Sequence, residues 1–411
     1  MYICSNHEQL CEKIRLAGID PTWFISYLSN RKQKVFVNGT FSSYQVIKSG
    51  VPQGSILGPW SYLLFCNDMP PCVKKCSVIL YADDTILLTS SKDLNEINSN
   101  LSREMSTCYH WLTNNGLAMH KGKTEAIVIS SKRKVHTTRN FNIKHDDQTI
   151  TPSPVLKYLG LKINNTLSGE EIVQSIVGKA SGRLKFLYRN QNHLNSKTRR
   201  TLANALIFSH FDYAMGAWYP SLTKKLKSRL QIAKNKVVRF ILGLGPRSHI
   251  GQTELDRVGL LCVEDRSEQL ILNTMFDVFY NVAPPYLSAN FSCNRNRHSS
   301  QSRQNSFKVP RTKSITQHNF SAIGSVAWND LPNNVKVLST KPAFKKAVKQ
   351  HLNRRAHERE NSDSVRYRLF VQSRVYLYCT CTITYMPNKP IYLSIYLSIY
   401  LSIYLSISSM M

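Results

Sequence analysis

Acidic residues are scarce in this chain of 411 residues. It contains 25 Asp and Glu residues against 54 Lys and Arg residues, which gives a formal net charge of +29. A positive excess of this size attracts polyanions, so we expect a nucleic-acid partner, with an anionic membrane surface as the alternative. Basicity alone does not decide the functional class of the protein, because ribosomal, histone-like and lipid-binding proteins share it.

Paired cysteine spacing is also absent. None of the ten cysteines forms a CxxC…CxxC or Cys₂His₂ pattern, which excludes the common structural zinc sites. The stretch from Cys293 to His298 suggests a metal knuckle but offers only a Cys and a His as ligands. No signal peptide opens the chain, so we expect free thiols and an intracellular location, in the nucleus or the cytoplasm.

The longest uncharged run lies at the end of the chain. Residues 391–407 repeat the unit Ile-Tyr-Leu-Ser, which just reaches membrane-spanning length but places a serine at every fourth position. The codons ATC-TAT-CTA-TCT encode this unit, so our interpretation is a translated microsatellite, with a membrane helix as the alternative. A membrane partner is therefore not expected. As a β-strand the repeat would be an aggregation hazard.

The first part of the chain alternates helical and extended patterns. We expect helices within residues 1–30, a hairpin from Gln33 to Lys48, a buried helix at 56–66, strands at 77–81 and 85–89, an amphipathic helix from Asp93 to Trp111, and strands at 124–129 and 155–163. Because tight turns join the extended runs, the sequence predicts an α+β fold with an antiparallel sheet.

Helical patterns follow. Apolar stripes run from Ile172 to Leu187 and from Leu226 to Phe240, and cations crowd the second stripe. We take Lys227, Lys234 and Arg239 as candidates to line a nucleic-acid groove, although such charges are more often a solvated helix face. Residues 286–316 have the composition of a polar linker, and a short helical unit from Phe320 to Leu352 contains Trp328.

Asp83 and Asp84 form the sharpest chemical signal, between two short apolar runs. Adjacent carboxylates at a hairpin turn repel each other unless a cation lies between them. Polymerases use such a pair to hold Mg²⁺, which takes hard oxygen ligands, in a two-metal site for nucleotidyl transfer. The alternative is a solvated turn, where Asp-Asp is common.

A glycine- and proline-rich loop upstream favours the metal site over the solvated turn. Residues 50–59 read GVPQGSILGP and lead into the apolar helix, which allows the backbone to approach a base pair or a phosphate. With the Tyr81-Ala82-Asp83-Asp84 segment downstream, the sequence resembles the reverse transcriptases of jockey-like LINE (non-LTR) retrotransposons. The resemblance extends from about Asn6 to Leu352.

The resemblance implies an RNA-directed DNA polymerase that uses Mg²⁺ or Mn²⁺, an RNA template, a DNA primer and dNTPs. It implies a palm with an antiparallel sheet and packed helices, followed by a helical thumb-like region. Asp83 and Asp84 would be the metal ligands, and Lys123 would act as general acid or as electrostatic partner of pyrophosphate. The template and substrate would contact Gly50, Pro52, Gln53, Gly54, Ser55, Tyr81 and Ala82, and the primer grip would be Tyr158, Leu159 and Gly160.

The sequence departs from the family at the third metal carboxylate. The family carries it on the first palm strand, before the helix that starts here near His7, whereas residues 1–5 do not match that motif. His120 also stands where Asn is usual, and Gly169-Glu170 replaces Trp-His. We therefore expect a truncated chain that lacks the fingers and is inactive by itself. Three hypotheses stay open: an enzyme, a catalytically dead nucleic-acid-binding remnant, and a translated relic.

We predict five parts. They are a partial palm at 1–165, a thumb-like region at 166–285, a polar linker at 286–316, a small unit at 317–355 and a low-complexity tail at 356–411.

Overall fold

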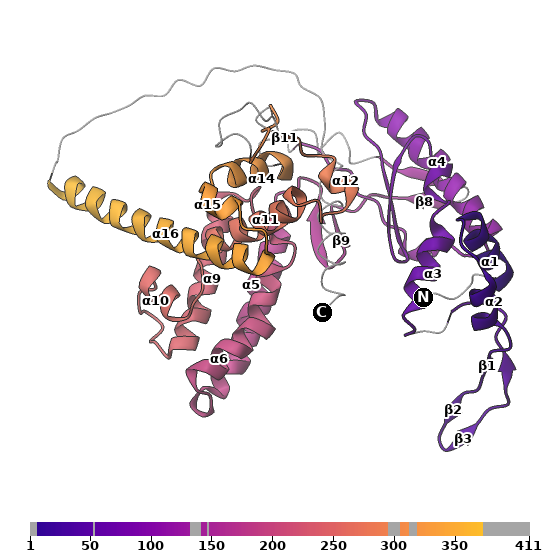
Figure 1. The fold of residues 1–411 in the computed structure, drawn as a ribbon, viewed down its shortest axis with the longest axis horizontal. Helices are drawn as coiled ribbons and strands as arrows, with labels where there is room; N and C mark the ends of the chain where they lie inside the picture. The colour runs from indigo at the N-terminus through magenta and orange to yellow at the C-terminus, as the bar shows by residue number, and fades with distance from the viewer. Residues whose placement is uncertain are drawn as a thin grey trace. The chain divides into compact units, whose positions relative to one another are not determined.

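The computed structural model describes residues 6–51, 54–131, 141–145, 148–294, 305–311 and 319–372. The chain divides into two compact units, one ending at Leu156 and the other beginning at Lys157 (Figure 1). The first combines helices with two-stranded antiparallel sheets, and the second is mainly helical. This confirms a mixed α/β chain with small antiparallel sheets.

The first unit contains most of the strands. Its elements are α1 (His7–Leu16), α2 (Thr22–Leu28), β1 (Lys32–Gln33), β2 (Phe36–Val37), β3 (Thr40–Phe41), β4 (Gln45–Val46), α3 (Leu57–Cys66), β5 (Ser77–Tyr81), β6 (Asp84–Leu88), α4 (Leu94–Asn114), β7 (Ile143–His145) and β8 (Gln148–Ile150), with 3₁₀ turns at Pro70–Cys72 and Lys121–Lys123. The pairs are β1 with β4, β2 with β3, β5 with β6, and β7 with β8.

The expected hairpin between Gln33 and Lys48 is confirmed. Asn38 and Gly39 form its turn with φ angles of 49° and 83°. Two left-handed residues in a row are what a two-residue type I′ hairpin turn requires, and Asn-Gly is its preferred sequence. The tip of the hairpin extends away from helices α1 to α3 (Figure 1).

Helix α4 covers the β5–β6 hairpin. Asp93 caps the helix by accepting a hydrogen bond from the backbone N–H of Asn95 at 2.9 Å. Leu94, Ile97 and Leu101 then pack in one cluster with Leu87 of β6. The expected packing of this helix on the strands is therefore confirmed.

Two strand predictions need correction. Residues 124–129 form no strand in the described part of the chain, although Ala126 accepts a backbone hydrogen bond from Ser153 at 2.8 Å. Their apolar side chains, among them Val128, pack against α4, so the apolar run reflects packing and not a sheet ladder. The single strand expected at 155–163 is instead a hairpin of β9 (Val155–Tyr158) and β10 (Leu161–Asn164).

The second unit begins at Lys157, within strand β9 of this hairpin. The elements that follow are α5 (Glu170–Arg189), α6 (Ser196–Ala203), a π-helical turn (Asn204–Phe208), α7 (Ser209–Asp212), α8 (Met215–Trp218), α9 (Lys224–Leu242), α10 (Gln252–Arg257), α11 (Val263–Phe279), α12 (Pro285–Ser288), β11 (Cys293–Asn294), β12 (Ser306–Phe307), α14 (Phe320–Asn329), α15 (Asn333–Lys336) and α16 (Lys341–Gln372), with a 3₁₀ turn at Gln191–His193.

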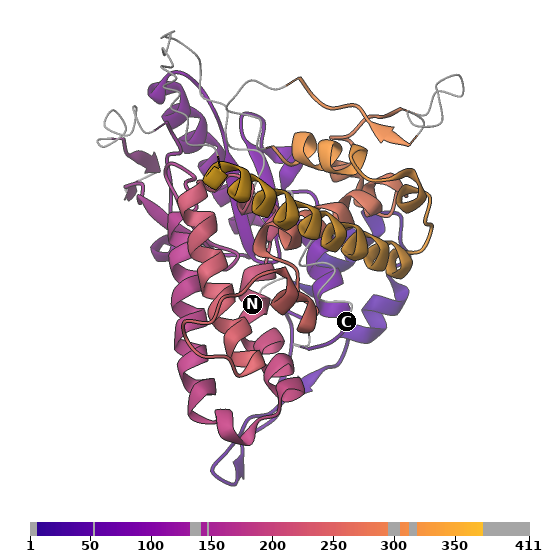
Figure 2. The same ribbon diagram turned by 90° about the vertical axis from the view of Figure 1, so that its left-hand side faces the viewer.

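Helices α5 and α9 pack side by side through the two stripes expected from the sequence (Figure 2). Thr223 caps the start of α9 through its hydroxyl, and Gly243 ends the helix in the left-handed region with φ 69°. Apolar periodicity, a polar N-cap and a C-terminal glycine thus agree on where this helix begins and ends.

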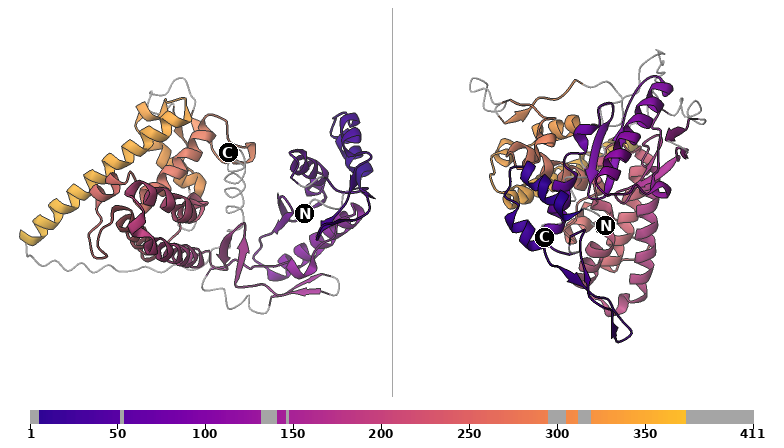
Figure 3. Two further views of the ribbon diagram at one scale, coloured as in Figure 1. Left: turned by 90° about the horizontal axis from the view of Figure 1, so that it is seen from below. Right: turned by 90° about the vertical axis from the view of Figure 1, so that its right-hand side faces the viewer.

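A second core lies around Trp328, whose side chain is fully buried against Phe279, Phe307 and Phe344. Its indole N–H donates a hydrogen bond to the Asn305 carbonyl at 3.0 Å. The expected helices between residues 320 and 352 thus share their core with α11. Helix α16 packs on α11 and continues past it, beyond residue 356 (Figure 3).

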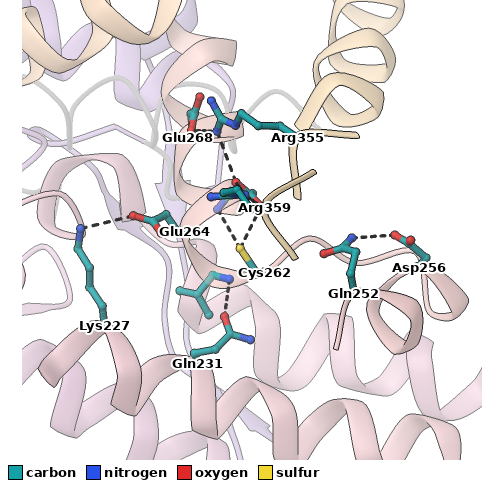
Figure 4. Close-up of polar contacts among 11 residues, drawn as sticks. Lys227, Gln231, Gln252, Asp256, Cys262, Glu264, Glu268, Arg355 and Arg359 are labelled. Carbon is teal, nitrogen blue, oxygen red and sulfur yellow. Dashed lines mark hydrogen bonds and ion pairs between the residues drawn. The ribbon is translucent and has the colours of Figure 1, made fainter. Parts of the chain in front are cut away.

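Polar contacts join α16 to α10 and α11, and Figure 4 shows those with α11. Asp265 is fully buried, and Arg359 donates to both of its carboxylate oxygens at 2.6 and 2.7 Å. Arg355 pairs with Glu268, and His357 lies 2.6 Å from the Asp256 carboxylate.

None of the helices in the described part of the chain is long and apolar enough to cross a membrane.

Candidate functional site

The Asp pair lies at the turn of the β5–β6 hairpin. Tyr81 pairs with Asp84 and Leu80 with Thr85, so Ala82 and Asp83 form a two-residue turn. Ala82 has a φ of 49°, a conformation that favours glycine in a hairpin turn. A left-handed alanine stores strain of about 1–3 kcal/mol, and such strain is concentrated at functional sites. The strands at 77–81 and 85–89 are therefore confirmed to within one residue.

Both carboxylates are exposed at this turn. Partial burial, and then the negative charge of Asp83, raise the pKa of the Asp84 carboxyl above its ordinary value. Each cause penalises the ionised form, and a cation between the two groups would relieve the repulsion. Two adjacent carboxylates are hard oxygen ligands, so the turn fits a divalent ion such as Mg²⁺ or Mn²⁺.

No third carboxylate joins the pair in the described part of the chain, where no group of three or more acidic, His or Cys side chains can hold a metal ion. Three acidic residues earlier in the chain contact other groups. Asp68 pairs with Lys13 at 2.8 Å, Glu12 pairs with Arg15, and Asp20 accepts a hydrogen bond from the backbone N–H of Thr22 at 3.0 Å.

In the glycine-rich loop before α3, a hydrogen bond holds the backbone at Gly50, whereas the space beside Gly54 is open. Gly50 is buried with φ 80°, and its carbonyl accepts a 2.7 Å hydrogen bond from Nε2 of His7. Gly54 has φ 84°, and a side chain there would meet no atom within 4 Å. The Ser55 hydroxyl accepts a hydrogen bond from the Gly58 N–H at 3.0 Å, at the start of α3. Pro52 and Gln53 lie outside the described residues.

Lys123 is exposed at the end of the 3₁₀ turn Lys121–Lys123. Its backbone N–H donates to the His120 carbonyl at 3.0 Å. Within the described residues, no hydrogen bond or ion pair joins Lys123 to Asp83 or Asp84. A catalytic role for this lysine stays a prediction.

The expected primer-grip residues lie at the end of a strand and in the turn that follows it, and not within one continuous strand. Strand β9 ends at Tyr158, and Leu159 and Gly160 follow with φ angles of 43° and 85°, as in a type I′ turn. The Tyr213 hydroxyl donates a 2.6 Å hydrogen bond to the Leu159 carbonyl and so fastens the turn to the helical region. Nothing in the sequence singles out Tyr213 for this contact, because the two residues are far apart in the chain.

The three groove candidates of α9 differ in accessibility. Lys227 lies 3.9 Å from the Glu264 carboxylate, and Nε of Arg239 donates to the Ser248 carbonyl at 2.8 Å. Lys234 is only 5% exposed, so it has no surface from which to reach a phosphate backbone. The expectation for Lys234 is therefore corrected. Its spacing from Leu230 and Val238 places it on the buried face of the helix.

Comparison with known proteins agrees with this geometry. Residues 5–163 match the family described as reverse transcriptase (RNA-dependent DNA polymerase), a range that includes the Asp83-Asp84 turn. The chain is 26% identical over 249 residues to the probable RNA-directed DNA polymerase from transposon BS of Drosophila melanogaster, covering 57% of this chain and 27% of that protein.

Two further relatives are similar. The RNA-directed DNA polymerase from mobile element jockey of Drosophila melanogaster is 25% identical over 228 residues, covering 53% of this chain and 24% of the relative. A Pol polyprotein from the type-1 retrotransposable element R1 of Nasonia vitripennis is 25% identical over 184 residues, covering 43% of this chain and 54% of the relative. The chain thus spans about a quarter of the first two relatives.

Proposed function

We propose that the Asp83-Asp84 turn is the metal-binding centre of an RNA-directed DNA polymerase, because it lies in the range that matches the reverse transcriptase family and the similar proteins come from non-LTR retrotransposons. The observation that supports this most is the adjacent carboxylate pair on a strained turn inside the matched residues. On this proposal residues 1–165 correspond to part of the palm, and the helices from residue 166 to 285 correspond to the thumb.

In this site the chain's residues would position the reacting groups. Asp83 and Asp84 would hold divalent ions, which supply activation of a primer 3′-hydroxyl and stabilisation of leaving pyrophosphate. The open backbone at Gly54 and the loop residues Pro52 and Gln53 would lie along the template and the incoming dNTP. Lys123 would stabilise the charge on pyrophosphate, and the Tyr158–Gly160 turn would contact the primer.

The experiment is primer extension on an RNA template with Mg²⁺ or Mn²⁺. We expect no extension by the 411-residue chain alone, because two carboxylates leave a two-metal site short of ligands. A chimaera that adds the fingers and first palm strand of the jockey relative to its N-terminus is expected to extend the primer. Robust extension by the chain alone would show that these two carboxylates suffice, and an inert chimaera that still binds the primer-template would contradict the catalytic proposal.

A second candidate function is nucleic-acid binding without catalysis. Its basis is the exposed charge on α9, where Lys225, Arg229 and Lys236 recur at spacings that place them on one helix face, although Arg229 is only half-exposed. Such a face would bind the phosphate backbone of a primer-template without reading bases. The assignment of Lys227 and Arg239 to this groove is part of the same proposal.

The triple variant Lys225→Glu, Arg229→Glu and Lys236→Glu tests this candidate. We expect it to weaken duplex binding and to flatten the salt dependence, with the slope reduced by about 0.9 for each phosphate that the helix no longer neutralises. The matched control reverses the exposed cations Lys345, Lys346 and Arg354 of α16. Equal weakening in both variants would show that bulk charge, and not a groove on α9, binds the duplex.

A further inference from the structure

The second unit contains a cavity of about 570 Å³ that is partly open to solvent, a volume typical of small-ligand pockets. Its wall comes from distant parts of the chain: residues 204–215, Lys234 of α9, residues 259–269, and Lys349 of α16. Every one of these residues lies outside the range that matches the reverse transcriptase family. The cavity thus belongs to the second unit, whereas the Asp83-Asp84 turn belongs to the first.

Lys234 is the unusual member of this wall. Its side chain is 5% exposed, yet it makes no hydrogen bond or ion pair with any residue that the structure describes. Its ammonium lies 5.5 Å from the centre of the Phe208 ring. Burial lowers the pKa of Lys234 to about 8, against the opposing charge of Asp212. The Lys234 ammonium therefore takes its hydrogen-bond acceptors from the cavity, either from water or from an anionic ligand.

The remaining charges leave the cavity positive. Arg266 and Asp212 neutralise each other through two hydrogen bonds, from Nε at 3.0 Å and from Nη2 at 2.7 Å. Lys349 donates only to the Gly259 carbonyl among the described groups, at 2.7 Å, and burial first and Arg200 second lower its pKa. Among the described residues, two ammonium groups therefore line the cavity without a carboxylate bonded to either.

The backbone of the wall is irregular as well. A π-helical turn at Asn204–Phe208 is followed by Ala214, a non-glycine residue with φ 49°. π-Helical turns and left-handed non-glycine residues are both energetically unfavourable and occur frequently at functional sites. Here both adjoin the cavity that Lys234 lines.

We propose that this cavity binds a small phosphorylated organic molecule, with the phosphate held by Lys349 and Lys234 and the organic part against Phe208 and Met215. A phosphate dianion matches two ammonium charges, and its oxygens supply the acceptors that Lys234 lacks. The volume leaves room for an organic group beside the phosphate, and aromatic and apolar side chains form that part of the wall.

Pyridoxal 5′-phosphate is a suitable probe because it carries a phosphate, an aromatic ring and an aldehyde. The aldehyde and the phosphate-bearing group occupy neighbouring positions on the ring, so a lysine that contacts the phosphate can also reach the aldehyde. After loss of its proton to solvent, the Lys234 amine would add to the aldehyde carbon, the carbonyl oxygen would leave as water, and added borohydride would reduce the imine to a stable secondary amine. Labelled lysines are then located by peptide mass spectrometry. Pyridoxal, which lacks the phosphate, is the matched control reagent.

We expect Lys234 to be labelled at least about tenfold faster than the exposed Lys236 of the same helix, the ratio given by about 1.4 kcal/mol of binding. This preference should disappear with pyridoxal, and phenyl phosphate should protect Lys234 in the unmodified protein. Lys349→Gln should abolish the preference, whereas Lys345→Gln, an exposed lysine of α16, should not. Equal labelling of Lys234 and Lys236, or no protection by phenyl phosphate, would mean that Lys234 is a structural lysine only.

Discussion

Asp265→Ala is expected to lower the free energy of unfolding of the helical unit by about 3 kcal/mol. The carboxylate is fully buried, and it accepts two hydrogen bonds from Arg359 and one from the Cys262 thiol at 3.1 Å. Removing one member of a buried ion pair leaves the other charge without compensation, which typically costs about 3–5 kcal/mol. The side chains of Arg355 and Arg359 keep 32% and 45% exposure, so they can rehydrate, and we expect the lower end of that range.

Urea denaturation followed by circular dichroism measures this effect. The matched control is Glu264→Ala, one residue away in the same first turn of α11, whose carboxylate is 61% exposed and lies 3.9 Å from Lys227 (Figure 4). An exposed pair contributes about 0–1 kcal/mol, so the control should change stability little. Surface substitutions usually change the free energy of unfolding by about 0.5 kcal/mol or less. If the two variants lose the same stability to within that amount, Asp265 does not anchor α16.

Local features of the first unit were predictable because short stretches of sequence encode them. The sequence Asn38-Gly39 strongly favours a type I′ turn. The apolar runs on either side of Ala82 and Asp83 can pair with each other only if these two residues form a turn. The Asp pair was found from the sequence because two adjacent carboxylates need a reason to stay together. In these cases sequence neighbours are also structural neighbours.

The two strand errors have a common cause. A short apolar run shows that a segment is buried, but not that it forms one strand with a partner. Residues 124–129 satisfy the pattern by packing on α4, so no ladder forms there in the described chain. In the segment from 155 to 163, the Leu159-Gly160 turn interrupts an apolar run that looks continuous in sequence.

The cavity and the burial of Lys234 could not be predicted from residues that are neighbours in the sequence. Its wall joins residues 204–215 to Lys349, which no periodicity connects. One signal was present: Lys234 follows Leu230 by four residues and precedes Val237 and Val238 on the apolar stripe of α9. A cation on an apolar stripe is a warning that it is buried, whereas counting the cations of a helix treats them all as exposed.

Asp83→Asn and Asp84→Asn are each expected to reduce primer extension by the chimaera by at least about a hundredfold. Replacing a group that merely orients a metal ligand often costs 10–100-fold, so replacing a direct ligand should cost at least the upper value. Steady-state incorporation of dNTP on an RNA template measures the reduction. Glu125→Gln, an exposed acidic residue in the same unit, is the control and should retain full activity.

Metal binding gives an independent test through its pH dependence. The raised pKa of Asp84 means that, as pH falls, this carboxylate takes up a proton earlier than an ordinary one, so Mn²⁺ affinity should fall at a higher pH than for a free carboxylate. Asp83→Asn removes one of the two causes, and the Asp84 pKa should decrease. Carboxyl titration by NMR in the absence of metal reports that shift. Unchanged titration of Asp84 in the Asp83→Asn variant would show that the two carboxylates do not interact, and Mn²⁺ binding that survives both substitutions would place the metal away from this turn.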